Sequence, residues 1–371
     1  MRRFWVILMA ISALSLIACD GGKSSKGDRS DKKRQEKTES AMPEYKQKAL
    51  DYAIAVYEAE EMGDECQMSE ISVDIAKYVA TLSNKHRKIF EKTYKEQYDL
   101  LANSESYLSD MTARDERGGR KSAHQNTYEK DFVESERGLN MRMVYVEGGT
   151  FTMGASEYDS EAYGREKPAH QVTLSPFYIA ECEVTQYQWR KIMGSTVYDQ
   201  KELSGDSAKY GVGDDYPMCY VSYEDAKAFC RELSLLTGRT YVLPTEAQWE
   251  FAAYGGVNSA GYKYSGGHSI NDVAWYGDNS GSTTHPVGQK LSNELGLYDM
   301  CGNIYEWCSD WQGSYSDESL FNPVGPNGGE WKVLRGGCWA SVAGNCRITS
   351  RGNSSPSSRN NIIGFRVVCL P

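Results

Sequence analysis

The part of this 371-residue chain from about residue 141 onward limits the possible folds more than any other feature. It holds most of the 35 glycines and nearly all of the eight tryptophans, and only short helical patterns interrupt it. A glycine count of 35 against ten prolines indicates a loop-rich fold rather than an array of helices. We therefore predict an α+β domain with few helices, short strands and long connections that form much of the surface.

Capping residues predict three short helices in this domain. Thr185–Gln188 and Thr245–Gln248 each have the reciprocal capping pattern, in which the threonine and glutamine side chains bond to each other's backbone N–H. Ser222 precedes two acidic residues, which favour a helix start because the helix dipole is positive there. Gly194 and Gly238 are placed to end two of these helices. Short alternating runs predict strands at 143–146 and 365–368.

The N-terminus has the pattern of an export signal. Two arginines precede an apolar run from Phe4 to Ala18, which is too short to span a bilayer comfortably. Leu16–Cys19 resembles a bacterial lipobox, which implies cleavage after residue 18 and acylation of the Cys19 thiol. The alternative is a plain signal peptide in which Cys19 is incidental. Acylation would give a stable membrane anchor, and we expect an outer-membrane lipoprotein that is exposed on the cell surface.

Three further segments separate the signal from the glycine-rich domain at 141–371. Residues 19–43 are rich in Lys, Ser, Asp, Glu and Gly without apolar periodicity, which predicts a solvated tether behind the lipidated cysteine. Residues 44–112 carry apolar side chains at helical spacing and are predicted to form a helical hairpin or a stalk. Residues 113–140 are charged and polar and are predicted to be a linker.

Charge and composition restrict the class of protein. A net charge of −10 and an isoelectric point near 5.2 argue against nucleic acid as a general partner, because such binding needs an electropositive surface. Apolar residues make up 40% of the chain and aromatic residues 12%, which is too much for wholesale disorder.

Four ordered motifs extend over about 230 residues of the C-terminal part. They are Met143–Gly154, Leu243–Glu250, Gly296–Trp307, and a last block with Arg335–Gly337, Trp339 and Gly364–Arg366. These motifs resemble the formylglycine-generating-enzyme-type domains, also called sulfatase-modifying factor domains. The resemblance implies a C-type-lectin-like fold, on which both oxidases and pure binding proteins occur.

The resemblance also bears on catalysis. The oxidases of this family hold copper with two cysteines of the last block, because thiolates suit Cu(I). In this chain the first of these positions falls on Ser341 and the second on Cys346, while Cys338 lies three residues before the serine. Iron-dependent relatives would need a histidine cluster, and the five histidines form no ligand-spaced set. We therefore expect no copper, no iron and no catalysis.

A structural calcium ion is the one metal that the resemblance suggests. The ligands carried over from the family enzymes are the side chains of Asp299 and Glu306 and the carbonyls of Gly302 and Ile304. Calcium prefers oxygen donors of both kinds. The alternative is that Glu306 forms an ion pair and Asp299 caps a turn.

Disulfides are available to an exported protein. Ten cysteines less the acylated Cys19 leaves nine, so at least one is unpaired in a single chain. The resemblance suggests a bond between Cys230, in the second predicted helix, and Cys369, just past the last motif. Cys369 is displaced by two residues from the matching position, and sequence does not fix connectivity.

The segment from Val333 to the C-terminus contains no Asp, Glu, Lys, Gln, His or Met. Between positions that many family members keep, this segment holds Ala, Ser, Val, Gly, Asn and Ile. Random replacement of the two adenines in an asparagine codon can produce codons for all of these residues. This pattern resembles the treponemal variable proteins, which are surface lipoproteins diversified by a retroelement. The alternative is ordinary drift in a turn-rich segment, where small residues are expected anyway. The kept positions are Trp339, Cys346–Arg347, Arg351, Pro356, Arg359 and Gly364–Arg366.

We therefore predict a variable region at about 338–362 that presents a ligand-binding face on a fixed scaffold. The kept residues would be buried, with Arg335, Arg347 and Arg366 paired internally. The expected ligand is a protein or a glycan. The predicted face comprises Cys338, Ala340, Ser341, Val342, Gly344, Asn345, Ser350, Gly352, Asn353, Ser354, Ser355, Ser357, Ser358, Asn360, Asn361 and Ile362.

Rings from preceding loops are expected to add rigid contact area at the edge of the predicted face, namely Trp275, Tyr276 and Trp311. Two other functions stay open at this point. One is a structural lipoprotein of envelope assembly, and the other is a family oxidase in which Cys338 and Cys346 together hold copper.

Overall fold

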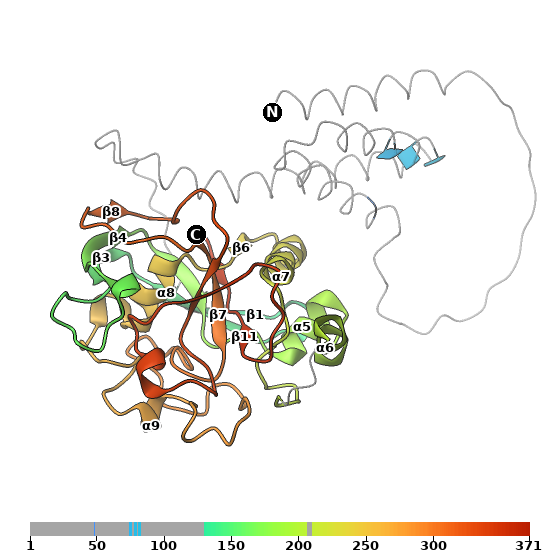
Figure 1. Ribbon diagram of the computed structural model, residues 1–371. Helices are drawn as coiled ribbons and strands as arrows, with labels where there is room; N and C mark the ends of the chain where they lie inside the picture. The colour runs from blue at the N-terminus through green and yellow to red at the C-terminus, as the bar shows by residue number, and fades with distance from the viewer. Residues whose placement is uncertain (1–47, 49–73, 76–77, 80, 83–129, 206–209) are drawn as a thin grey trace, which may run out of the picture. The chain divides into compact units, whose positions relative to one another are not determined.

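The computed structural model describes residues 48, 74–75, 78–79, 81–82, 130–205 and 210–371 (Figure 1). The chain divides into two compact units, Met1–Glu105 and Ser106–Pro371. In the first unit the described residues 74–75 and 78–79 are helical. The predicted signal, Cys19, the tether, and most of the helical segment and the linker lie outside the described residues and stay predictions. Among the residues that are described, no helix has both the length and the apolar character needed to cross a bilayer.

The second unit is built around a five-stranded antiparallel sheet. The last strand of the chain, β12, lies between β5 and β6, so the beginning and the end of the domain are joined in one sheet. In spatial order the strands are β1 (Phe132–Glu134), β2 (Met141–Val146), β5 (Phe177–Ala180), β12 (Val368–Cys369) and β6 (Tyr241–Val242).

Three helices begin where their capping residues predict. Thr185, Ser222 and Thr245 each accept a hydrogen bond from the third backbone N–H of the helix that follows. Gly194 and Gly238 end two of them in the left-handed conformation, each with φ of 71°. The α-helices are α5 (Gln186–Met193), α6 (Val197–Ser204), α7 (Tyr223–Thr237), α8 (Glu246–Ala253) and α9 (Ile270–Val273), and the short 3-10 helices are η1 (Glu136–Gly138), η2 (Gly164–Glu166), η3 (Gly256–Asn258) and η4 (Ala343–Cys346).

The five-stranded sheet separates two hydrophobic clusters. Met143 of β2 and Tyr178 of β5 face the first cluster, which α5 and α7 cover. Val144 and Ile179, one residue further along, face the second cluster, to which α8 contributes. Successive side chains of a strand point to opposite faces, so one sheet supports both cores. In Figure 1, α5, α6 and α7 lie on one side of the central strands and β3, β4, β8 and α8 on the other.

Two smaller sheets complete the domain. In spatial order, one contains β10 (Gly352–Ser354), β9 (Lys332–Arg335), β7 (Tyr305–Trp311) and β11 (Ile363–Gly364), and the other contains β3 (Gly149–Met153), β4 (His170–Leu174) and β8 (Leu320–Phe321). The prediction of one strand at 365–368 is therefore wrong. The chain leaves the four-stranded sheet at β11 and enters the five-stranded sheet at β12, and Phe365 and Arg366 are buried between them.

The domain also begins earlier than predicted. The segment 113–140 was expected to be a linker, but β1 pairs with β2 and places Phe132 opposite Met143. The Arg239 guanidinium covers the Phe132 ring at 4.4 Å from its centroid. A strand of three residues has too short a pattern to be visible in a charged stretch.

The predicted disulfide between Cys230 and Cys369 is not formed. Both residues are free, buried thiols of the first hydrophobic cluster, and the Cys369 thiol donates to the Leu370 carbonyl at 3.6 Å. Burial raises the pKa of both thiols. These cysteines therefore pack as small apolar side chains.

Candidate functional site

Two buried arginines of the C-terminal segment bind to α8. Arg335 donates to Glu246 at 2.7 Å and to Glu250 at 2.5 Å, and Arg351 binds both Glu246 oxygens at 2.7 Å. All four side chains are at most 4% exposed. Burial alone would raise the pKa of Glu246, but Arg351 and Arg335 hold it below its usual value. Both guanidiniums are therefore needed where they lie, because removing either would leave a buried carboxylate undercompensated.

Two more arginines bind carboxylates on other elements. Arg347 holds both oxygens of Glu166 in η2 at 2.9 Å, and Arg366 holds both oxygens of Glu306 in β7 at 2.7 and 2.8 Å. Arg347 and Arg366 are 3% and 0% exposed. The predicted internal pairing of Arg335, Arg347 and Arg366 is thus confirmed. We call Arg335, Arg347, Arg351 and Arg366 the anchor arginines.

Most of the predicted face lies at the surface between these anchors, but part of it does not. Cys338, Ser341, Ser350 and Asn361 are only 2–7% exposed, so they lie in the core and their assignment to the face is corrected. Twelve of the sixteen residues are at least partly exposed, and we call these twelve the exposed face. They are Ala340, Val342, Gly344, Asn345, Gly352, Asn353, Ser354, Ser355, Ser357, Ser358, Asn360 and Ile362.

Trp339 joins the two halves of the segment. Its indole N–H donates to the Asn361 carbonyl at 3.2 Å, and its own carbonyl accepts from the Ser280 hydroxyl at 2.7 Å. Trp339 is half-buried rather than part of the core. The Trp339 side chain therefore connects the beginning of the segment 338–362 to its end, near the surface.

The second half of the segment lies against the start of α7. Arg359 forms an ion pair with Asp225 in the first turn of this helix. The Tyr223 N–H donates to the Pro356 carbonyl at 3.0 Å. These contacts fix the backbone of the second half of the segment, in which β10 is the one strand.

The aromatic residues expected at the edge of the face have different surroundings. Tyr276 is 6% exposed and belongs to the second hydrophobic cluster. The Trp275 ring stacks on His285 with 3.8 Å between centroids, and the Trp311 ring has the Lys332 ammonium at 3.9 Å. Trp275 and Trp311 are partly exposed, so only these two of the three rings reach the surface.

The positions that match the oxidase cysteines are buried. The Cys338 sulfur lies 3.4 Å from the Ser341 hydroxyl, which in turn lies 3.5 Å from the Tyr305 hydroxyl. Burial raises the pKa of Cys338 and of Cys346, which favours the neutral thiols. The position that the resemblance gives to the first copper ligand holds the Ser341 hydroxyl, which lacks the soft thiolate that suits Cu(I).

The described histidines do not meet. His170 packs on Tyr315, His268 on Tyr262 and His285 on Trp275. More generally, no three His, Cys, Asp or Glu side chains of the described residues are arranged to hold a metal ion together.

The predicted calcium ligands are only partly available. Glu306 is committed to Arg366 and also accepts the Trp249 indole N–H at 2.8 Å, which is the ion-pair alternative for this residue. Asp299 Oδ2 accepts the Gly288 N–H at 2.6 Å, and within the described part of the chain its buried Oδ1 has no hydrogen-bond partner. Burial raises the pKa of Asp299 to about 6.

Glu183 lies near this group and was not part of the predicted set. It is 1% exposed, and neither of its carboxylate oxygens has a hydrogen-bond partner among the described residues. Burial, and then the charge of Asp299, raises the pKa of Glu183 well above its usual range. Unpartnered carboxylate oxygens suit a hard cation, so Asp299 and Glu183 are the side chains that would hold calcium here. No local sequence pattern marks Glu183, and calcium stays a prediction.

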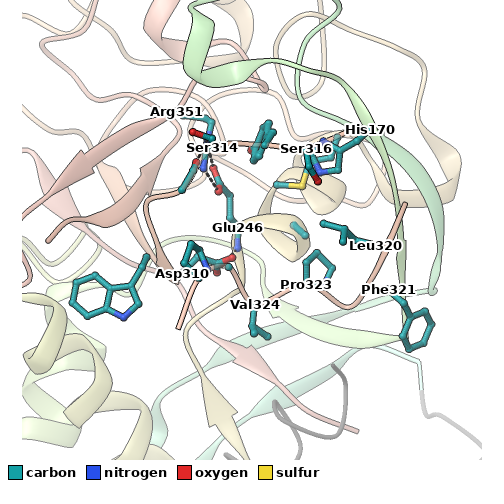
Figure 2. A pocket seen from close by; sticks show the side chains of 17 residues that line it. His170, Glu246, Asp310, Ser314, Ser316, Leu320, Phe321, Pro323, Val324 and Arg351 are labelled. Carbon is teal, nitrogen blue, oxygen red and sulfur yellow. Dashed lines mark hydrogen bonds and ion pairs between the residues drawn. The ribbon is translucent and has the colours of Figure 1, made fainter. Parts of the chain in front are cut away.

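A cavity of about 400 Å³ lies between the start of α8, the end of β7 and the loop at 313–326. No sequence motif points to it. Asp310 is 4% exposed and contributes to its wall, and its Oδ2 accepts the Glu246 N–H at 2.8 Å and the Ser309 hydroxyl at 3.1 Å. Figure 2 shows the polar residues Asp310, Glu246 and Arg351 on one side and the apolar residues Leu320, Phe321 and Pro323 on the other.

The Asp310 carboxylate has no ion-pair partner among the described residues. Burial, reinforced by the negative charge of Glu246, raises its pKa to about 7. The positive charge of Lys332 lowers the pKa of Asp310. The Lys332 ammonium does not form an ion pair with this carboxylate, because it donates to the Ser309 carbonyl at 2.7 Å. Burial lowers the pKa of Lys332 to about 8.

Comparison with known proteins identifies the domain. The sulfatase-modifying factor enzyme 1-like domain model, FGE-sulfatase, matches residues 128–370, which include β1. The chain belongs to this family. The predicted resemblance and the α+β, C-type-lectin-like fold of this sulfatase-modifying factor domain are confirmed.

Three relatives illustrate the range of the family. The structure of Treponema denticola variable protein 1 is similar with 31% identity and a TM-score of 0.58, covering 65% of this chain and 99% of that one. Chaperone protein LppX of Paenibacillus barcinonensis is 32% identical in an alignment 219 residues long, and the match covers 46% of this chain and 71% of LppX. The formylglycine-generating enzyme of Mus musculus is 29% identical in an alignment 249 residues long, and the match covers 53% of this chain and 65% of the enzyme.

The raised pKa of Asp310 predicts a pH-dependent stability. The folded state retains a proton at pH values where the unfolded chain has lost it, so this group makes the free energy of unfolding fall as the pH rises from about 4 to 7. Asp310→Asn removes this decrease in the free energy of unfolding. As the pH rises from 5 to 8, the free energy of unfolding of the variant should therefore increase by roughly 2–3 kcal/mol relative to that of the parent chain. Denaturant titrations at both pH values measure this, with the exposed Asp272→Asn as a control that should show no change.

Calcium should raise the melting temperature if Asp299 and Glu183 bind it. A concentration one hundred times the Kd would stabilise the fold by about 2.7 kcal/mol. Asp299→Asn and Glu183→Gln should each abolish the rise, whereas Asp272→Asn should keep it. Equal melting temperatures with calcium and with a chelator would refute this site.

Proposed function

We propose that this protein is a surface-displayed, lipid-anchored binding protein whose ligand contacts the exposed face, and that it is not an enzyme. The observation that carries the proposal is the alternation within residues 338–362. Buried anchors and exposed small side chains follow one another closely along this segment. Such a segment supports changes of side chain at the surface without changes of backbone.

The exposed side chains take little part in the internal bonding. Val342 is 66% exposed, and Ala340 is exposed as well. Arg347 holds the turn between them and the following residues by donating to the Gly344 carbonyl at 3.0 Å and to Glu166. New side chains at the exposed positions would therefore meet solvent or ligand rather than the core.

The face of this chain is shallow and polar, because its members are mostly serine, asparagine, glycine and alanine. Backbone amides and small hydroxyls provide adaptable hydrogen bonds to a protein or a glycan. The partly exposed Trp275 extends the available surface from a preceding loop. Nucleic acid is not a proposed ligand for a chain with a net charge of −10.

The case against catalysis depends on the thiols. Ser341 stands at the position that the resemblance gives to one member of the copper-binding pair, and a hydroxyl lacks the soft thiolate that suits Cu(I). Similarity to a variable protein agrees with a binding role, although the same family includes formylglycine-generating enzymes.

Cys19 would provide the membrane anchor. The lipobox-like sequence before it supports acylation, and the tether at 20–43 would hold the folded domain away from the lipid. This part of the proposal requires two results. The Cys19→Ala protein should no longer partition into the detergent phase, and protease added to intact cells should cleave the domain. Unchanged partitioning would refute it.

Diversification of the face is tested by DNA sequence. We expect a reverse transcriptase gene and a near-duplicate of the C-terminal coding segment beside this gene. Clones sequenced from one population should differ at adenine-derived codons of the exposed face and agree at the anchor arginines. Absence of both the reverse transcriptase gene and the duplicate would contradict the proposal and favour a structural lipoprotein of envelope assembly.

A further inference from the structure

We infer that the Asp310 cavity is a second binding site, which takes a small amphipathic primary amine. The cavity places the Asp310 carboxylate, which forms no direct ion pair with a described residue, beside aromatic rings and opposite an apolar wall. A ligand with an ammonium group and a short apolar body matches all three features. This site is separate from the exposed face.

The arginines and glutamates around the cavity pair with one another, and among the described residues none forms an ion pair with Asp310. Two arginines, Arg335 and Arg351, offset the two carboxylates of Glu246 and Glu250. That group of four is neutral in total. Asp310 adds a negative charge, and the nearby Lys332 ammonium binds the Ser309 carbonyl rather than this carboxylate. A cationic ligand would pair directly with Asp310, whereas an anionic ligand would be repelled by it.

One oxygen of Asp310 is available to a ligand. The hydrogen bonds to this carboxylate, from the Glu246 N–H and the Ser309 hydroxyl, both end on Oδ2. No hydrogen bond from a described residue ends on Oδ1, and the Asp310 residue as a whole is 4% exposed. An ammonium group that reaches it would form a charge-assisted hydrogen bond, which is among the stronger kinds in proteins.

The remaining wall suits the body of such a ligand. Trp311 and Tyr315 line the cavity. Each ring already has a cation of the protein over it, Lys332 at 3.9 Å and Arg351 at 3.9 Å, so the rings offer the ligand apolar contact. Leu320, Phe321 and Pro323 lie on the side opposite Asp310, as Figure 2 shows. The volume of about 400 Å³ falls within the range of small-molecule pockets.

Variation of the exposed face would leave this cavity unchanged. Arg351 is the one residue of 338–362 that lines it, and Arg351 is a buried anchor rather than a member of the exposed face. The amine site would therefore be a constant feature of a protein whose other surface changes. It does not depend on the proposed function.

Calorimetry with the purified full chain and phenethylamine tests this inference. We expect saturable binding at pH 8, with 2-phenylethanol and phenylacetate each weaker by at least about tenfold. Asp310→Asn should weaken the binding of phenethylamine by the same factor and should remove the preference for phenethylamine over 2-phenylethanol. Asp272→Asn, an exposed matched control, should bind as the parent chain does.

A second variant keeps the inference testable if Asp310→Asn does not fold. Val324→Phe leaves Asp310 in place and fills the cavity from its wall, so it should block phenethylamine while the melting temperature shows a folded domain. The inference is overturned if phenethylamine does not bind, if the alcohol binds equally well, or if a folded Asp310→Asn variant retains the preference for the amine.

Discussion

Each anchor arginine is neutralised by a carboxylate of an element far from it in sequence, and the course of the C-terminal segment depends on these pairs. The segment has little regular structure of its own, since only the 3-10 helix η4 and the short strands β10 and β11 lie between β9 and β12. Breaking a buried ion pair by removing one partner costs about 3–5 kcal/mol, because the other charge is left uncompensated. The arginines therefore fix the backbone where hydrogen-bonded ladders do not.

Close backbone packing adds a second constraint. Gly337 has φ of +78°, and a Cβ there would lie 2.7 Å from the Cys346 sulfur. A Cβ on Gly364 would lie 2.4 Å from the Met218 carbonyl oxygen. Together with the arginines, these glycines confine the segment at both ends, while the twelve residues of the exposed face between them reach the surface.

The sequence predicted local features well and long-range features poorly. Capping boxes located α5, α7 and α8, because the signal lies within four residues. The helix α6 was not predicted, although Thr196 and Asp199 cap it in the same way, because no apolar stripe follows. The burial of Ser341, the role of Glu183 and the Asp310 cavity depend on contacts between distant segments, which no local pattern shows.

The most direct test of this account compares unfolding free energies within the segment. Ala340→Tyr, Val342→His and Ser354→Phe should each change the free energy of unfolding by less than about 0.5 kcal/mol, as surface substitutions generally do. Arg347→Ala and Phe365→Ala should each cost roughly 3–5 kcal/mol, through a stranded Glu166 charge and a core cavity respectively. If the first three variants prove as destabilising as the last two, the segment is packed core and the account of an exposed face on arginine anchors is wrong.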